Sequence, residues 1–176
     1  MASNRQTVVV PGPQLGSQPW WPSVHQMINA AYKRKDVHAF PRDWSRLRED
    51  PSAGATGLAE ELGPQGELLV IFENDHPIAS AGAVPFRGDA WVPSGPGVET
   101  DAHVTDGEIT QPAPDIVSED WEVCSFAVHR DRRKEGLSKV LLVELCAFVK
   151  AKGAKRLVAN YSLEETGNFW PKQVRR

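Results

Sequence analysis

The sequence predicts an α/β (α+β) fold in which helices flank a central mixed sheet, and three observations lead to this prediction. Within residues 121–151, a β-prone run leads through a basic turn into an amphipathic helix. Two apolar runs within residues 68–84 flank a short polar turn, as in a β-hairpin. The chain has 176 residues, the length of one domain with a core of its own, so we expect a single domain over residues 1–176.

The first expected elements are a strand and a helix. Residues 7–10 are a β-prone run, and a Pro and Gly turn follows them. From residue 22 to 34, apolar side chains recur at three- and four-residue spacing, which is typical of a helix that buries one face. The residues of this face are Val24, Met27, Ile28 and Ala31.

A loop separates this helix from a second, shorter one that we expect at residues 57–62. Thr56 precedes the short helix as its N-cap, because a Thr hydroxyl can accept a hydrogen bond from an amide of the first turn. Gly63 and Pro64 follow the helix, and this pair is typical of a helix end.

The predicted hairpin is followed by a long insert. Apolar runs at residues 68–72 and 78–84 flank the polar turn at residues 73–77. Residues 87–120 are then rich in Pro, Gly and acidic residues and show no apolar period. Such a length is unusual in a compact domain, and we interpret this acidic insert as a disordered, solvated loop, with an acidic lid as the alternative.

The region after the insert predicts a strand, a turn and a helix. The strand is indicated by the alternating or β-prone residues Trp121, Val123, Cys124, Phe126 and Val128. From Leu137, apolar residues recur at helical spacing, and Gly153 is placed to end the helix in a left-handed conformation. The expected buried face of this helix consists of Leu137, Val140, Leu141, Leu145 and Phe148.

The turn at residues 130–136 has the chemistry of an anion site. Amides at a helix start have no intrahelical partner and carry the positive end of the helix dipole. Gly136 lets a ligand approach the backbone because it has no Cβ. Four cations lie nearby, namely Arg130, Arg132, Arg133 and Lys134. A diphosphate would fit this turn.

The segment from Arg133 through Gly136 to Ser138 resembles the phosphate-binding signature of the GNAT acetyltransferase superfamily. That signature is Arg or Gln, two residues, Gly, one residue, then Gly or Ala, so Ser138 departs from it at the last position. The resemblance also covers the preceding strand, the following helix, a strand at residues 156–161 and a helix-like segment at residues 168–172. It implies a GNAT acyltransferase-like fold whose mixed sheet curves around a splayed pair of strands.

The resemblance implies that acetyl-CoA is the cosubstrate. The pantetheine arm would lie along the strand against the main chain of Phe126, Ala127 and Val128, and the Val128 N–H would stabilise the oxyanion of the tetrahedral intermediate. The diphosphate would contact the signature turn. Its expected binding residues are Arg133, Lys134, Glu135, Gly136, Leu137 and Ser138.

The resemblance also implies catalytic residues. Glu122 lies six residues before Val128, the spacing at which histone-acetylating members carry a glutamate base. The alternative is that Glu122 is an exposed residue at a strand end. Many members protonate the leaving thiolate with a Tyr where this chain has Trp170, so protonation would fall to water or to Tyr161. The alternative for Tyr161 is that it packs at the end of its strand.

The implied function is an N-acetyltransferase that transfers the acetyl group of acetyl-CoA to a primary amine of a small molecule or a protein, by direct attack in a ternary complex. The alternative is a catalytically weak module that binds acetyl-CoA or a protein partner. Pro171 interrupts the last expected helix, and Arg176 comes before the two closing strands of the usual fold. Either the fold is shortened or a partner subunit covers the strand edge, which would make a homodimer.

Composition and charge argue against several other kinds of site. Cys124 and Cys146 are expected in the core, and five His residues without ligand spacing predict no metal. No stretch has transmembrane length and no signal peptide is evident, so no membrane contact and a cytoplasmic or nuclear location are expected. Residues 129–176 carry 12 Lys or Arg against 5 Asp or Glu, which suits an anionic cofactor. Without aromatic interleaving, this charge does not predict nucleic-acid binding.

Overall fold

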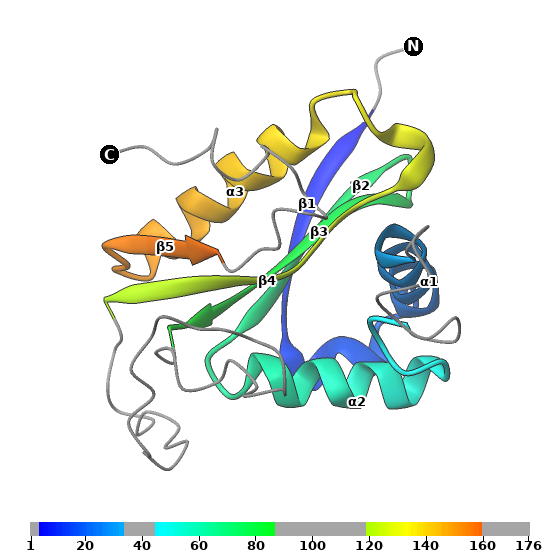
Figure 1. Ribbon diagram of the computed structural model, residues 1–176, viewed down its shortest axis with the longest axis horizontal. Coiled ribbons are helices and arrows are strands. Elements are labelled where there is room, and N and C mark those ends of the chain that lie inside the picture. Colours follow the sequence, from blue (N-terminus) through cyan, green and yellow to red (C-terminus); the bar gives the residue numbers. More distant parts are fainter. Residues whose placement is uncertain (1–3, 34–44, 87–118, 160–176) are drawn as a thin grey trace, which may run out of the picture.

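A computed structural model describes residues 4–33, 45–86 and 119–159. It contains a five-stranded mixed sheet with the strand order β1-β2-β3-β4-β5, in which β4 and β5 are parallel and the other neighbours are antiparallel (Figure 1). The predicted mixed fold is confirmed. The strands are β1 (Arg5–Pro11), β2 (Glu67–Glu73), β3 (His76–Pro85), β4 (Asp120–Val128) and β5 (Arg156–Ala159).

Helices cover both faces of this sheet. Figure 1 shows α1 (Trp21–Tyr32) and α2 (Pro51–Leu62) on one side and α3 (Leu137–Ala151) on the other. Two short 3-10 helices, η1 (Gly12–Ser17) and η3 (Arg130–Arg132), follow β1 and β4. The fold therefore has three layers, and each face of the sheet buries a separate set of side chains.

The alternation of side chains along the strands builds these two cores. Leu68, Val70 and Phe72 of β2 pack with the apolar faces of α1 and α2. The residues between them, Leu69 and Ile71, pack with α3 on the opposite face. Both faces of β2 are thus apolar, because a strand at this place in the sheet has a helix layer on either side.

The second helix begins earlier than the sequence predicts. It starts at Pro51, and Asp50 is its N-cap, whose side chain accepts a hydrogen bond from the Ala53 amide at 2.8 Å. The Thr56 hydroxyl lies inside the helix and donates to the Ser52 carbonyl at 3.1 Å. The prediction of Thr56 as the N-cap was wrong because Asp50 followed by Pro51 is a stronger start signal than Thr56.

The hairpin is confirmed, with a tight turn at Asn74 and Asp75 between β2 and β3. Both turn residues have positive φ values, 49° and 64°. A two-residue turn with this conformation matches the right-handed twist of the two strands that it joins. The acidic insert ends earlier than predicted, because Asp120 already belongs to β4. Residues 87–118, like residues 160–161 and 168–172, lie outside the described part of the chain.

The buried stripe of α3 is narrower than predicted. Its buried residues Leu137, Leu141, Leu145 and Val149 follow one another at four-residue spacing. Val140, which the spacing placed in the core, is 39% exposed, and Phe148 is only partly buried. Cys146 is also exposed, so its assignment to the core was wrong, whereas Cys124 packs partly against the α1 and α2 core. Gly153 has the left-handed conformation predicted after the helix, with φ of 86°.

Candidate functional site

A β-bulge divides β4 into two halves. Ser80 of β3 pairs with Ala127 and Gly82 pairs with Cys124, so Ser125 and Phe126 together lie opposite Ala81. Ser125 has a φ of 47°, a left-handed conformation that a bulge residue can adopt. The extra residue exchanges the faces of the strand, because Val123 packs on the α3 core while Ala127 packs on the α1 and α2 core.

Beyond the bulge, the second edge of β4 is open. The strand pairs with β5 only from Asp120 to Val123, and within the described residues no strand pairs with the remaining edge. On the β3 side, the His129 amide donates to the Ile78 carbonyl at 2.9 Å. In an antiparallel ladder the neighbouring pair, Val128 with Ala79, is then not hydrogen-bonded. The N–H and C=O of Val128 therefore point away from β3, toward the open edge.

Several backbone amides lie together in the turn after β4. After η3, the residues Lys134 and Gly136 have left-handed φ values of 71° and 77°, with Glu135 between them at negative φ. Alternation of this kind turns successive N–H groups toward one side and forms a concave anion site. In the described part of the chain, no backbone or side-chain group accepts a hydrogen bond from the amides of residues 134–138. Their positions next to the start of α3 add the positive end of its dipole.

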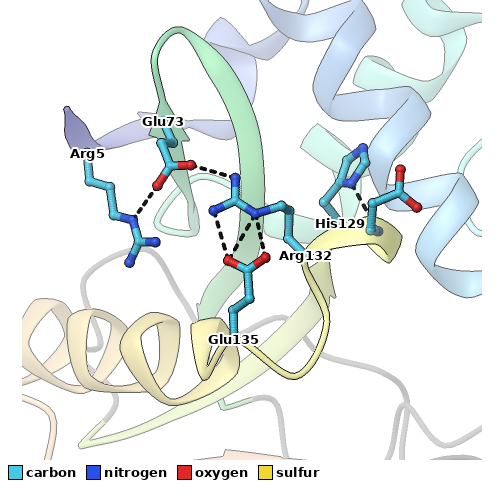
Figure 2. A network of polar contacts seen from close by, with 6 residues as sticks. Arg5, Glu73, His129, Arg132 and Glu135 are labelled. Atoms are coloured by element: carbon cyan, nitrogen blue, oxygen red, sulfur yellow. Dashed lines mark hydrogen bonds and ion pairs between the residues drawn. The ribbon is translucent and has the colours of Figure 1, made fainter. Parts of the chain in front are cut away.

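Three of the four cations predicted around this turn have partners in the protein. Arg132 contacts two carboxylates (Figure 2). Arg130 Nη2 donates to the Lys33 carbonyl at 3.3 Å, and Arg133 Nη2 donates to the Ala31 carbonyl at 3.0 Å. The guanidinium groups of Arg130 and Arg133 thus donate to carbonyls at the C-terminal end of α1. Carbonyls at a helix end have no intrahelical partner. The positive turn is thereby joined to α1.

Glu122 lies on the other half of β4. It is opposite Val84 on the sheet face that α1 and α2 cover, and it is 1% exposed. The alternative of an exposed strand-end glutamate is therefore wrong. Its strand also pairs with β5 at this position, where Glu122 is opposite Val158. Tyr161 and Trp170 lie outside the described residues.

A polar cluster on the same sheet face has no signal in the sequence. Arg46 donates two hydrogen bonds to Glu61, at 2.5 and 2.7 Å, and its guanidinium carbon lies 5.8 Å from the centre of the Tyr32 ring. Burial raises the pKa of the Tyr32 phenol, while the charge of Arg46 opposes this rise. The Asn29 side chain, which accepts from the Leu47 amide at 2.7 Å, holds the Arg46 segment against α1. The members of the cluster come from three separate segments.

Two features are absent from the described residues, a metal-ligand cluster and a membrane-spanning helix. The ranges 4–33, 45–86 and 119–159 contain no group of three or more His, Cys, Asp or Glu residues that could hold a metal ion. Within the same ranges, no helix is long and apolar enough to span a membrane.

Comparison with known proteins identifies the fold. The model of the acetyltransferase (GNAT) family matches residues 21–168. No curated protein matches the sequence significantly. Among solved structures, an acetyltransferase of Trypanosoma brucei is similar with a TM-score of 0.52 and 15% identity, over 98% of this chain and 93% of that chain.

Two further structures have defined substrates or cofactors. An aminoglycoside N-acetyltransferase in complex with CoA is similar with a TM-score of 0.55 and 12% identity, over 98% of this chain and 87% of that chain. A ribosomal-protein-alanine N-acetyltransferase of Brucella melitensis has a TM-score of 0.55 and 13% identity, over 98% of this chain and 92% of that chain. At these identities the similarity concerns the fold.

Proposed function

Because the chain belongs to the acetyltransferase (GNAT) family, we propose that it transfers the acetyl group of acetyl-CoA to a primary amine by direct attack in a ternary complex. The observations that carry this proposal are the N–H of Val128, which points to the open edge of β4, and the amides of residues 134–138 in the turn that follows the same strand. An extended thioester arm ending in a diphosphate has the complementary chemistry. In this proposal residues 1–176 act as one domain.

The cosubstrate would be held mainly by the main chain. The pantetheine arm would lie along the open edge of Phe126, Ala127 and Val128, as an added strand does. The diphosphate would accept hydrogen bonds from the amides of the turn, and the positive charge around the turn would add to this attraction. The residues proposed for the diphosphate are Arg133, Lys134, Glu135, Gly136, Leu137 and Ser138.

Val128 would act on the thioester through its N–H. As the amine nitrogen attacks the carbonyl carbon, negative charge develops on the carbonyl oxygen, and the Val128 N–H can donate to that oxygen. Collapse of the intermediate breaks the C–S bond and leaves the acetyl group on nitrogen and a thiolate on CoA. Since this N–H is directed away from β3, it is available without loss of a sheet hydrogen bond.

Glu122 would remove the proton of the amine, directly or through water. A lysine-like amine with a pKa near ~10.4 is mostly protonated at neutral pH and cannot attack in that form. The carboxylate of Glu122 lies on the face covered by α1 and α2, on the strand that carries Val128. Tyr161 remains the proposed proton donor to the thiolate, with water as the alternative.

The acceptor would be an amine on a small molecule or on a protein. Both kinds occur among the proteins that share this fold, since one acts on an aminoglycoside and another on a ribosomal-protein alanine. The polar cluster of Tyr32, Arg46 and Glu61 lies on the same sheet face as Glu122 and is a candidate wall of the acceptor site.

The first test is calorimetric titration of the protein with acetyl-CoA, followed by thiol release against a panel of amines and peptides. We expect saturable binding and turnover with at least one amine. Gly136→Val should weaken binding strongly, because a β-branched residue is strained at a φ of 77°. Absence of acetyl-CoA binding in the wild type would contradict the proposal, and binding without turnover would favour the weak binding module instead.

A further inference from the structure

The contacts of the turn before α3 point to a role for Arg132 that rests on the proposed function and extends it. We propose that Arg132 is a positioning residue that binds no phosphate itself. It neutralises Glu135 and ties the turn to the β2–β3 hairpin, so that the amide site stays preformed and attractive to a diphosphate.

Figure 2 shows the guanidinium of Arg132 between two carboxylates. Arg132 Nε lies 2.8 and 3.0 Å from the two Glu135 oxygens, and Nη2 lies 2.8 Å from Glu135 Oε2. On its other side, Nη1 lies 2.6 Å from Glu73 Oε2 at the end of β2. All three nitrogens of the guanidinium are therefore used inside the protein, which leaves the group poorly placed to bind a phosphate.

Glu135 explains why the turn needs the contacts of Arg132. It lies between Lys134 and Gly136, the two left-handed residues that orient the amides, so its charge belongs to the same turn as the anion site. A carboxylate there would repel a diphosphate. The hydrogen bonds from Arg132 also lower the pKa of Glu135, so the residue stays ionised and its charge is cancelled by pairing. The pair keeps the carboxylate turned back toward the hairpin.

Glu73 extends this network to the edge of the sheet. Its second oxygen accepts from Arg5 Nε at 2.8 Å, so Glu73 bridges β1 and the turn (Figure 2). The Glu73 side chain is 12% exposed, less than the 28% of Arg132. A planar guanidinium can serve Glu135 through two nitrogens and Glu73 through a third, whereas the ammonium of a Lys cannot reproduce this geometry.

The test is a double-mutant cycle on the dissociation constant of CoA, measured by calorimetry on the whole chain. Arg132→Gln is expected to raise the dissociation constant ~10-fold, because Glu135 is then free to oppose the diphosphate. Glu135→Gln keeps the backbone amide that the diphosphate would use and removes only the carboxylate, so it should not weaken binding, and the double variant should return to within ~3-fold of the wild type. Lys152→Gln is the matched control: it removes one cation and an ion pair with Glu67 at the other end of α3, and it should leave binding unchanged.

A second readout separates positioning from general stability. S-acetylpantetheine carries the thioester but no diphosphate, so Arg132→Gln should lower kcat/KM for acetyl-CoA and leave kcat/KM for acetylpantetheine unchanged. If Arg132→Gln does not fold, Arg132→Lys replaces it in the cycle, with a smaller rise in the dissociation constant expected.

Three results would overturn the inference. They are an Arg132→Gln variant that binds CoA as the control does, a double variant as weak as Arg132→Gln alone, and an equal loss with acetyl-CoA and acetylpantetheine. Failure of the wild type to bind CoA is a different result, since it would remove the proposed function itself.

Discussion

At the scale of single residues, the proposed site combines main-chain donors with one buried side chain. Val128 and the turn amides are main-chain donors whose direction is set by backbone conformation. The Glu122 side chain, by contrast, is 1% exposed and lies on the sheet face that α1 and α2 cover. Carboxylates are rarely buried to this extent in folded proteins. Its proposed role as the base rests on this burial and on its place in the strand that carries Val128.

Glu122→Gln tests that role at the residue scale. The substitution keeps the size of the side chain and removes its basicity, so kcat should fall ~100-fold, and the pH profile should shift upward because only amine that is already neutral can react. Steady-state kinetics over a range of pH measures both effects. The matched control is Glu119→Gln, an exposed Glu of the same segment that pairs with Lys155. A pH profile like that of the wild type would exclude Glu122 as the base.

At the scale of elements, the bulge in β4 is the feature on which the proposed site depends. It places the second half of the strand in a new register, with Ala127 and Cys124 on one face and Val123 on the other. In the part of the chain that the structure describes, pairing to β5 extends from Asp120 to Val123, on the other side of the bulge from Val128. One strand can therefore close the sheet with its first half and present main-chain groups to a ligand with its second half.

Val128→Pro tests this division of the strand. Proline removes the N–H, and since that N–H takes no part in the ladder with β3, the sheet should tolerate the change as an edge position does. We expect turnover to fall ~100-fold or more while CoA still binds. Val128→Ala, which keeps the N–H, is the matched comparison and should lose far less activity. Equal activity of the Pro and Ala variants would contradict the proposed oxyanion contact.

At the scale of the whole molecule, the sheet separates two cores that are joined at few places. Ile28 lies in the core under α1 and α2, and Leu141 lies in the core under α3, each with no exposed surface. The arginines of the turn form one of the links between the layers, because Arg130 and Arg133 reach the end of α1. The turn proposed for the diphosphate thus contacts the end of α1.

The two cores predict additive stability effects. Ile28→Ala and Leu141→Ala should each lower the free energy of unfolding by ~2–5 kcal/mol, through lost burial and the cavities left behind. Because the two side chains share no core, the double variant should equal the sum within ~0.5 kcal/mol. Denaturant unfolding followed by circular dichroism measures these values. A large deviation from additivity would show that the faces of the sheet are packed as one unit.

The sequence alone determined the elements whose signals are local. The hairpin, the strand, turn and helix after residue 120, and the cap at Gly153 follow from short-range spacing and turn chemistry, and the structure contains them. Local signals also misled, since Val140 satisfies helical spacing as well as Val149 does, and only the direction of α3 against the sheet decides which of them is buried.

The tertiary structure decided what depends on partners far apart in the chain. The bulge at Ser125 is defined by the register against β3, and the burial of Glu122 by the helices that cover its face. The pairing of Arg132 with Glu73 joins residues 59 positions apart, and the Tyr32, Arg46 and Glu61 cluster joins three segments. Such contacts leave no periodic pattern in the sequence, because they form only when packing brings distant side chains together.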